Sequence, residues 1–106
     1  MAKYLYLASY TTEGLKGLLK DGGSKRKKDL SAAVKEMKGT LETLYFAFGD
    51  NDVYSIVDVP DNVSAATIAL KINASGAAKV KTVVLLTPEQ VDEATKINVS
   101  YRPPGH

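Results

Sequence analysis

The chain has 106 residues, of which 44% are hydrophobic and 25% charged, as in a single globular domain with one core. It has no cysteine and a formal net charge of +2. This composition excludes disulfides, thiolate catalysis and cysteine-bound zinc, and it gives no overall field that would require a nucleic-acid or membrane partner. No apolar run approaches the roughly 20 residues that cross a bilayer. The first residues do not form a secretory signal, so we expect a cytoplasmic location.

The chain begins with a strand followed by a short helix. From Lys3 to Tyr10, apolar and aromatic side chains alternate with the period of two that is typical of a strand. Thr11 or Thr12 can then cap a helix, which the pair Gly22-Gly23 ends because glycine tolerates positive φ.

A second helix is expected before the next strand. Its apolar stripe consists of Leu30, Ala33, Val34 and Met37. Because the four cations at positions 25–28 would oppose the dipole of a helical first turn, we expect the regular helix to begin near Asp29 and to be capped by Gly39.

The middle of the chain predicts an antiparallel hairpin. Residues 40–48 and 52–59 both have strand character, and they are separated by the turn-forming residues Gly49, Asp50 and Asn51. Leu44, Phe46 and Phe48 are expected on one face of the first of these strands.

The last third of the chain predicts a helix, a strand and another helix. Asp61 or Asn62 can cap a helix that ends at Ser75-Gly76, and residues 80–86 form a strand. The sequence Thr87-Pro88-Glu89-Gln90 has the form of a capping box and opens a helix to about Thr95. Residues 97–106 are expected to be an extended or disordered tail, which leaves a domain of residues 1–96.

The element order β-α-β-β-α-β predicts an α+β, ferredoxin-like fold with a four-stranded antiparallel sheet. Right-handed crossovers place both main helices on one face of that sheet. The strands nevertheless carry apolar or aromatic side chains on both faces, whereas a face open to water should be polar. We therefore expect the bare face to pair with a second copy of the chain, as a homodimer or higher homo-oligomer.

The hairpin region also resembles a known family. The stretch from Phe48 to Asp61 is similar to the signature of the GYD domain family, a Gly-x-Tyr-Asp motif that leads into an apolar strand and an acidic-x-Pro-Asp turn. Gly49 and Asp52 match the motif, whereas Asn51 replaces its tyrosine. Arg26, Gly39 and the stretch from Ser75 to Thr82 agree with other family positions. The resemblance implies a dimeric α+β barrel, in a family that is largely uncharacterised.

Few residues offer catalytic chemistry. The only histidine, His106, is the last residue of the tail, so we expect no metal site and no cofactor. Asp52 and Tyr54 are the candidates for general acid–base catalysis. The candidate ligand-binding residues are Tyr6, Tyr10, Tyr45 and Arg26.

Three functions remain open. The first is a self-associating domain of unknown function that binds a small apolar or aromatic molecule. The second is a cofactor-independent enzyme of the monooxygenase or isomerase kind that uses tyrosine and Asp52. The third, a nucleic-acid accessory protein that uses the basic run 25–28, is less expected because no aromatic side chain interrupts that run.

Overall fold

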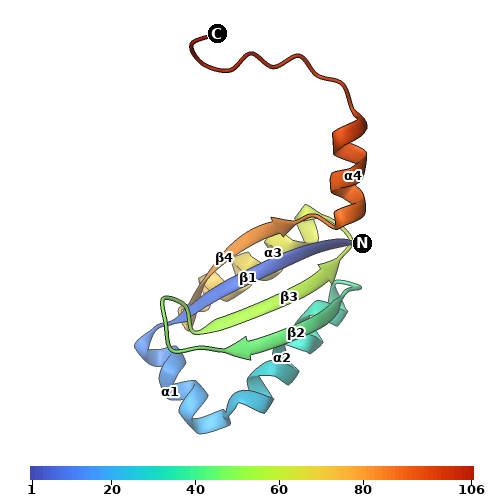
Figure 1. Cartoon of the computed structure of the whole chain (residues 1–106). Coiled ribbons are helices and arrows are strands. Elements are labelled where there is room, and N and C mark those ends of the chain that lie inside the picture. The colour runs from blue at the N-terminus through green and yellow to red at the C-terminus, as the bar shows by residue number, and fades with distance from the viewer.

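A computed structural model describes all 106 residues as one antiparallel sheet with four helices (Figure 1). The elements in chain order are β1 (Ala2–Tyr10), α1 (Thr12–Asp21), α2 (Gly23–Glu36), β2 (Thr40–Phe46), β3 (Val53–Val59), α3 (Asn62–Ala74), β4 (Ala78–Leu85) and α4 (Pro88–Lys96). The strand order is β2-β3-β1-β4, and every neighbouring pair is antiparallel. This arrangement confirms the α+β, ferredoxin-like fold.

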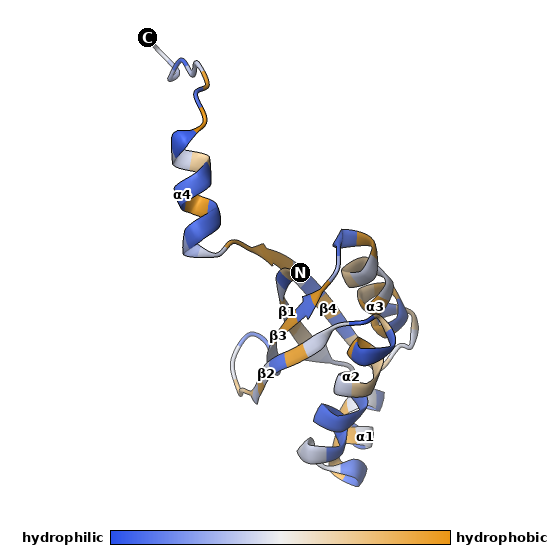
Figure 2. Cartoon of the chain, turned by 90° about the vertical axis from the view of Figure 1, so that its right-hand side faces the viewer, coloured by the Kyte–Doolittle hydropathy of each residue, from blue (hydrophilic) through white to orange (hydrophobic).

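Helices cover only one face of the sheet, and Figure 2 shows α2 and α3 together on that side. Helix α2 packs mainly against β2, and α3 packs mainly against β4. The two helices therefore lie over the outer strands, and the central strands β1 and β3 run between them.

The core lies between this helical layer and the sheet. Val57 and Val59 of β3 are fully buried, and Tyr4 and Tyr6 of β1 are almost fully buried. Val34 of α2 and Ala65 and Ile68 of α3 complete the cluster from the helical side. The alternation seen in the sequence thus directs the even-numbered side chains of β1 and the odd-numbered side chains of β3 toward the helices.

The N-terminal caps are the polar residues that the sequence suggests. The Thr11 hydroxyl accepts from the Gly14 N–H at 3.2 Å, and the Asp61 carboxylate accepts from the Ser64 N–H at 2.9 Å. The backbone and side-chain bonds from Ser64 lower the pKa of Asp61. At α4, Thr87 and Gln90 bond reciprocally in a capping box.

The prediction that helix α2 begins near Asp29 was wrong, because the helix begins at Gly23. The cations do not oppose its first turn as strongly as expected, since Asp29 forms ion pairs with both Lys25 and Arg26 one turn away. Asp21, at the end of α1, adds a second carboxylate 3.6 Å from Arg26. These carboxylates offset the unfavourable interaction of the cations with the helix dipole.

Two details at strand and helix ends also differ from expectation. Strand β2 ends at Phe46 rather than continuing to residue 48, and Phe48 is 106% exposed in the connection to β3. The left-handed residue after α2 is Lys38 (φ 61°), not Gly39. Gly39 serves close packing instead, because a Cβ there would overlap the Asp58 carbonyl oxygen and press on Val59.

Helix α4 and residues 97–106 project away from the sheet (Figure 1). No residue of α4 is buried, and the tail after Lys96 forms neither helix nor strand. No helix of the chain has both the length and the hydropathy required to cross a membrane.

Two glycines of α1 provide a matched test of the packing of this helix. A Cβ at Gly14 would overlap the Ala77 carbonyl oxygen and lie 2.9 Å from Tyr10 Cδ1, whereas a Cβ at Gly17 meets nothing within 4 Å. We predict that Gly14→Ala lowers the free energy of unfolding by about 2 kcal/mol through overpacking. Gly17→Ala should raise it by up to about 1 kcal/mol through helix propensity. Urea unfolding of both variants measures the difference, and equal effects would contradict the close approach of α1 to residue 77.

Candidate ligand pocket

The space between α2 and α3 over the central strands forms a pocket of about 540 Å³. Fourteen of its 21 lining residues are hydrophobic. Helix α2 contributes Leu30 and Ala33, Met37 follows directly after this helix, and α3 contributes Ile68 and Ile72. Because the helices follow β2 and β4, their side chains do not close the layer above β1 and β3, and this separation creates the cavity.

Small side chains in the strands enlarge the pocket from below. Ala8 of β1 pairs with Val53 of β3 and Val80 of β4, and Tyr6 pairs with Ser55 of β3. Alanine and serine fill little of the height between sheet and helices. Tyr6 is held in place, since its hydroxyl donates to the Ala65 carbonyl oxygen at 2.6 Å. Burial raises the pKa of Tyr6 to about 12.

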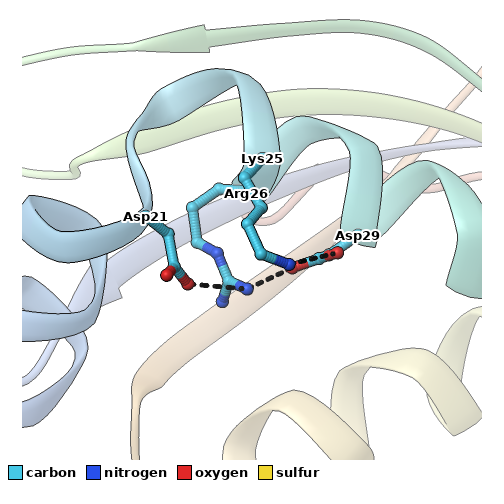
Figure 3. A network of polar contacts seen from close by, with 4 residues as sticks. All are labelled: Asp21, Lys25, Arg26 and Asp29. Carbon is cyan, nitrogen blue, oxygen red and sulfur yellow. Dashed lines mark hydrogen bonds and ion pairs between the residues drawn. The ribbon is translucent and has the colours of Figure 1, made fainter.

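Arg26 lies at the rim of the pocket within a network of charges (Figure 3). Its guanidinium group forms ion pairs with Asp29 and Asp21, and Lys25 adds a further contact to Asp29 at 3.4 Å. The Nε atom of Arg26 is buried and has no hydrogen-bond partner. The positive charge of Arg26 is thus already paired with carboxylates, while one of its donors remains free.

Tyr10 lines the same end of the pocket. Its pKa is raised by burial, and the positive charge of Arg26 opposes part of that increase. The backbone N–H of Tyr10 donates to Asp52 Oδ2 at 2.8 Å. This bond fixes the end of β1 to the start of β3.

The structure brings together some of the candidate site residues and separates others. Tyr6, Tyr10 and Arg26 all line the pocket. Asp52 is outside the lining, and its carboxylate bonds to the backbone of β1. Tyr45 and Tyr54 form a cross-strand pair on the opposite face of the sheet.

Ser55 is a lining residue that the sequence reasoning did not select. Its side chain is 1% exposed, and its hydroxyl forms none of the hydrogen bonds found in the chain. The sequence does contain a signal, since Ser55 is the one polar residue among the inward-facing positions Val53, Ser55, Val57 and Val59. A serine within such an apolar alternation indicates a polar group placed in the core.

The face of the sheet without helices carries both apolar and charged residues. Leu5 pairs with Ile56 and Val83, and Leu7 pairs with Tyr54. At one end of this face, Lys3 Nζ lies 2.8 Å from Glu42 and 3.1 Å from Asp58. These hydrogen bonds, first to Glu42 and then to Asp58, raise the pKa of Lys3. Lys79 and Lys81 of β4 lie toward the other end.

No three His, Asp or Glu side chains come together in a group that could hold a metal ion. The candidate site is therefore a mainly apolar pocket with a few polar groups, built on a ferredoxin-like α+β domain.

A family model described as the GYD domain matches residues 4–95, and the chain belongs to this family. Among curated proteins, no match is found. Asn51, which replaces the tyrosine of the family signature, lies in the connection between β2 and β3 and not in the pocket lining. Its Oδ1 accepts from the Ser9 hydroxyl at 3.4 Å, so this position contacts the end of β1.

The raised pKa of Tyr6 makes a testable contribution to stability. The folded protein retains the Tyr6 proton up to about pH 12, whereas the unfolded chain loses it near pH 10. The contribution of Tyr6 to the free energy of unfolding is complete below pH 10. It is lost as the pH rises toward 12, because ionisation of Tyr6 then favours the unfolded state. We predict that Tyr6→Phe lowers the free energy of unfolding by about 1 kcal/mol at pH 8, because it removes the hydrogen bond to the Ala65 carbonyl oxygen.

The same variant should show a shallower fall in the free energy of unfolding between pH 10 and 12. Urea unfolding at several pH values measures this slope. Tyr101→Phe, which changes an exposed tail residue, is the control and should match the unmodified protein. An unchanged slope in Tyr6→Phe would show that Tyr6 ionises normally.

Proposed function

We propose that the protein binds a small, mostly apolar or aromatic molecule in the pocket between the sheet and helices α2 and α3. The observation that carries this proposal is the cavity itself, about 540 Å³ in volume and lined mainly by hydrophobic side chains. Ligand sites of proteins are clefts of this size and character.

A substitution on α2 tests whether the cavity is the binding site. Ala33 lines the pocket, while its neighbour Ala32 is exposed on the same helix. We predict that Ala33→Trp fills the cavity and weakens binding of naphthalene at least tenfold, and that Ala32→Trp leaves it unchanged. Isothermal titration calorimetry measures both, with circular dichroism to verify folding. Folded Ala33→Trp protein that binds as tightly as Ala32→Trp would exclude this pocket.

We further propose that the bare face of the sheet binds a second copy of the chain. Four strands about 4.8 Å apart and about seven residues long give a face of roughly 450 Å² in projection. Apolar side chains, among them Leu5, Leu7 and Ile56, occupy the middle of this face, and exposed apolar patches of a few hundred Å² on a monomer often mark an interaction site. Tyr45, 71% exposed in the isolated chain, together with Tyr54, offers the aromatic area and hydroxyl groups that protein interfaces favour.

The charges on this face support a second copy as the occupant. Glu42 and Asp58 lie at one end of the sheet with Lys3, and Lys79 and Lys81 lie toward the other end. A twofold axis that brings opposite ends together places the acidic pair of one copy near the lysines of the other. A single surface can therefore complement itself, as an isologous interface requires.

A charge at the centre of this face tests self-association. Ile56 lies between Leu5 and Thr43 in the sheet, and Leu70 is an exposed apolar residue of α3. We predict that Ile56→Lys gives a monomer at micromolar concentration, because two lysines would face each other across the axis, while Leu70→Lys keeps the dimer. Sedimentation velocity measures the molecular mass. A monomeric unmodified protein would contradict the proposal.

The two other functions have less support. In the enzyme hypothesis, Asp52 and Tyr54 would act on a molecule in the pocket, but neither residue lines it. In the nucleic-acid hypothesis, Lys25 to Lys28 would bind phosphates, but Lys25 and Arg26 are already paired with carboxylates of the same chain. Ligand binding and self-association require neither a catalytic residue in the pocket nor the breaking of these ion pairs.

A further inference from the structure

The pocket contains polar groups that the chain itself does not satisfy. The Ser55 hydroxyl lies in the lining contributed by the strands and is almost fully buried. At the rim, Arg26 Nε is buried without a partner, and the Tyr10 hydroxyl forms none of the hydrogen bonds found in the chain. Other polar groups of the lining are satisfied, since Tyr6 donates to Ala65 and the Thr67 hydroxyl donates to the Val63 carbonyl oxygen at 2.7 Å.

The Ser55 hydroxyl has no partner in the chain, but its oxygen is not among the fully enclosed unpaired atoms, so it borders the open space of the pocket. Buried polar groups are nearly always hydrogen-bonded, because an unsatisfied one loses its bonds to water without replacement. Alanine at position 55 would fit the same space and would place no polar group on the floor of a mainly apolar pocket. The position of Ser55 in the pocket lining instead suits a bond to a bound molecule.

The charges around the pocket indicate that this molecule is neutral. Arg26 and Lys71 are the cations of the lining, and Asp29 and Glu36 are its anions, so the formal charges balance. Arg26 is moreover paired with Asp21 and Asp29. A carboxylate or phosphate that entered the pocket would lose its hydration, and it would find Lys71 as the one lining cation without an ion pair, offset by the equally unpaired Glu36.

We propose that the pocket binds a neutral, mostly apolar molecule that carries a carbonyl oxygen, and that the Ser55 hydroxyl donates a hydrogen bond to this oxygen. The proposal rests on the proposed ligand-binding function and names the chemical class of its ligand. The Tyr10 hydroxyl can likewise donate a hydrogen bond to an acceptor at the polar end of a longer ligand.

Three probes with one ring system separate the possibilities. Naphthalene has no acceptor, 2-acetylnaphthalene has a neutral carbonyl, and 2-naphthoate has a negative charge. We expect calorimetry to give the tightest binding for 2-acetylnaphthalene, about tenfold tighter than for naphthalene, and the weakest for 2-naphthoate. Tighter binding of 2-naphthoate than of the ketone would overturn the neutral ligand class.

Two variants then assign the oxygen to Ser55. Ser55→Ala should reduce the affinity for 2-acetylnaphthalene about tenfold, so that it equals the affinity for naphthalene. The affinity for naphthalene and the thermal stability should not fall. Thr67→Val removes a lining hydroxyl that is already bonded within α3, and it should not change the ratio of the two affinities.

The outcomes distinguish this inference from the proposed function. If none of the three probes binds, the ligand-binding function itself fails. If naphthalene and 2-acetylnaphthalene bind equally, or if Ser55→Ala preserves the preference for the ketone, the pocket stands and the role of Ser55 is wrong.

Discussion

The position of two helices over the outer strands is the constraint on which the remaining features depend. Helix α2 packs on β2 and α3 packs on β4, and the closely packed core, in which Tyr4, Val57 and Val59 meet Val34 and Ala65, lies toward one end of the central strands. At the other end the helical layer stays open, and a cavity of about 540 Å³ remains above β1 and β3. Because both helices occupy the same face, the other face has no cover from its own chain. The pocket and the bare surface therefore have one common origin.

The division of the sheet also separates two kinds of tyrosine. Tyr6 and Tyr10 point toward the helices, where burial raises the pKa of both. Tyr45 and Tyr54 lie on the bare face and remain accessible in the isolated chain. The period of two in the strands produces this separation, because neighbouring residues point to opposite faces. The first pair can contact a ligand in the pocket, and the second pair suits an interface between copies.

The fold could be predicted from the sequence because its signals are local: alternating side chains, capping residues and turn residues at each boundary. The start of α2 could not be predicted in this way, because it depends on ion pairs of Arg26 with Asp21 and Asp29 that stabilise a basic first turn. The candidate site could be predicted from the sequence only in part. Of the candidate residues, Tyr6, Tyr10 and Arg26 line one pocket, whereas Asp52 lies outside the lining because its carboxylate bonds to the backbone of Tyr10. Ser55 was missed because its significance depends on the open layer of helices above it.

The most direct test of this account is a crystal of the protein under xenon pressure, because xenon binds to apolar cavities without requiring a particular ligand chemistry. We predict a xenon site in the pocket between Ala33 of α2, Ile68 of α3 and Ala8 of β1. Helices α2 and α3 in contact above β1 and β3, with no xenon between them and the sheet, would contradict it.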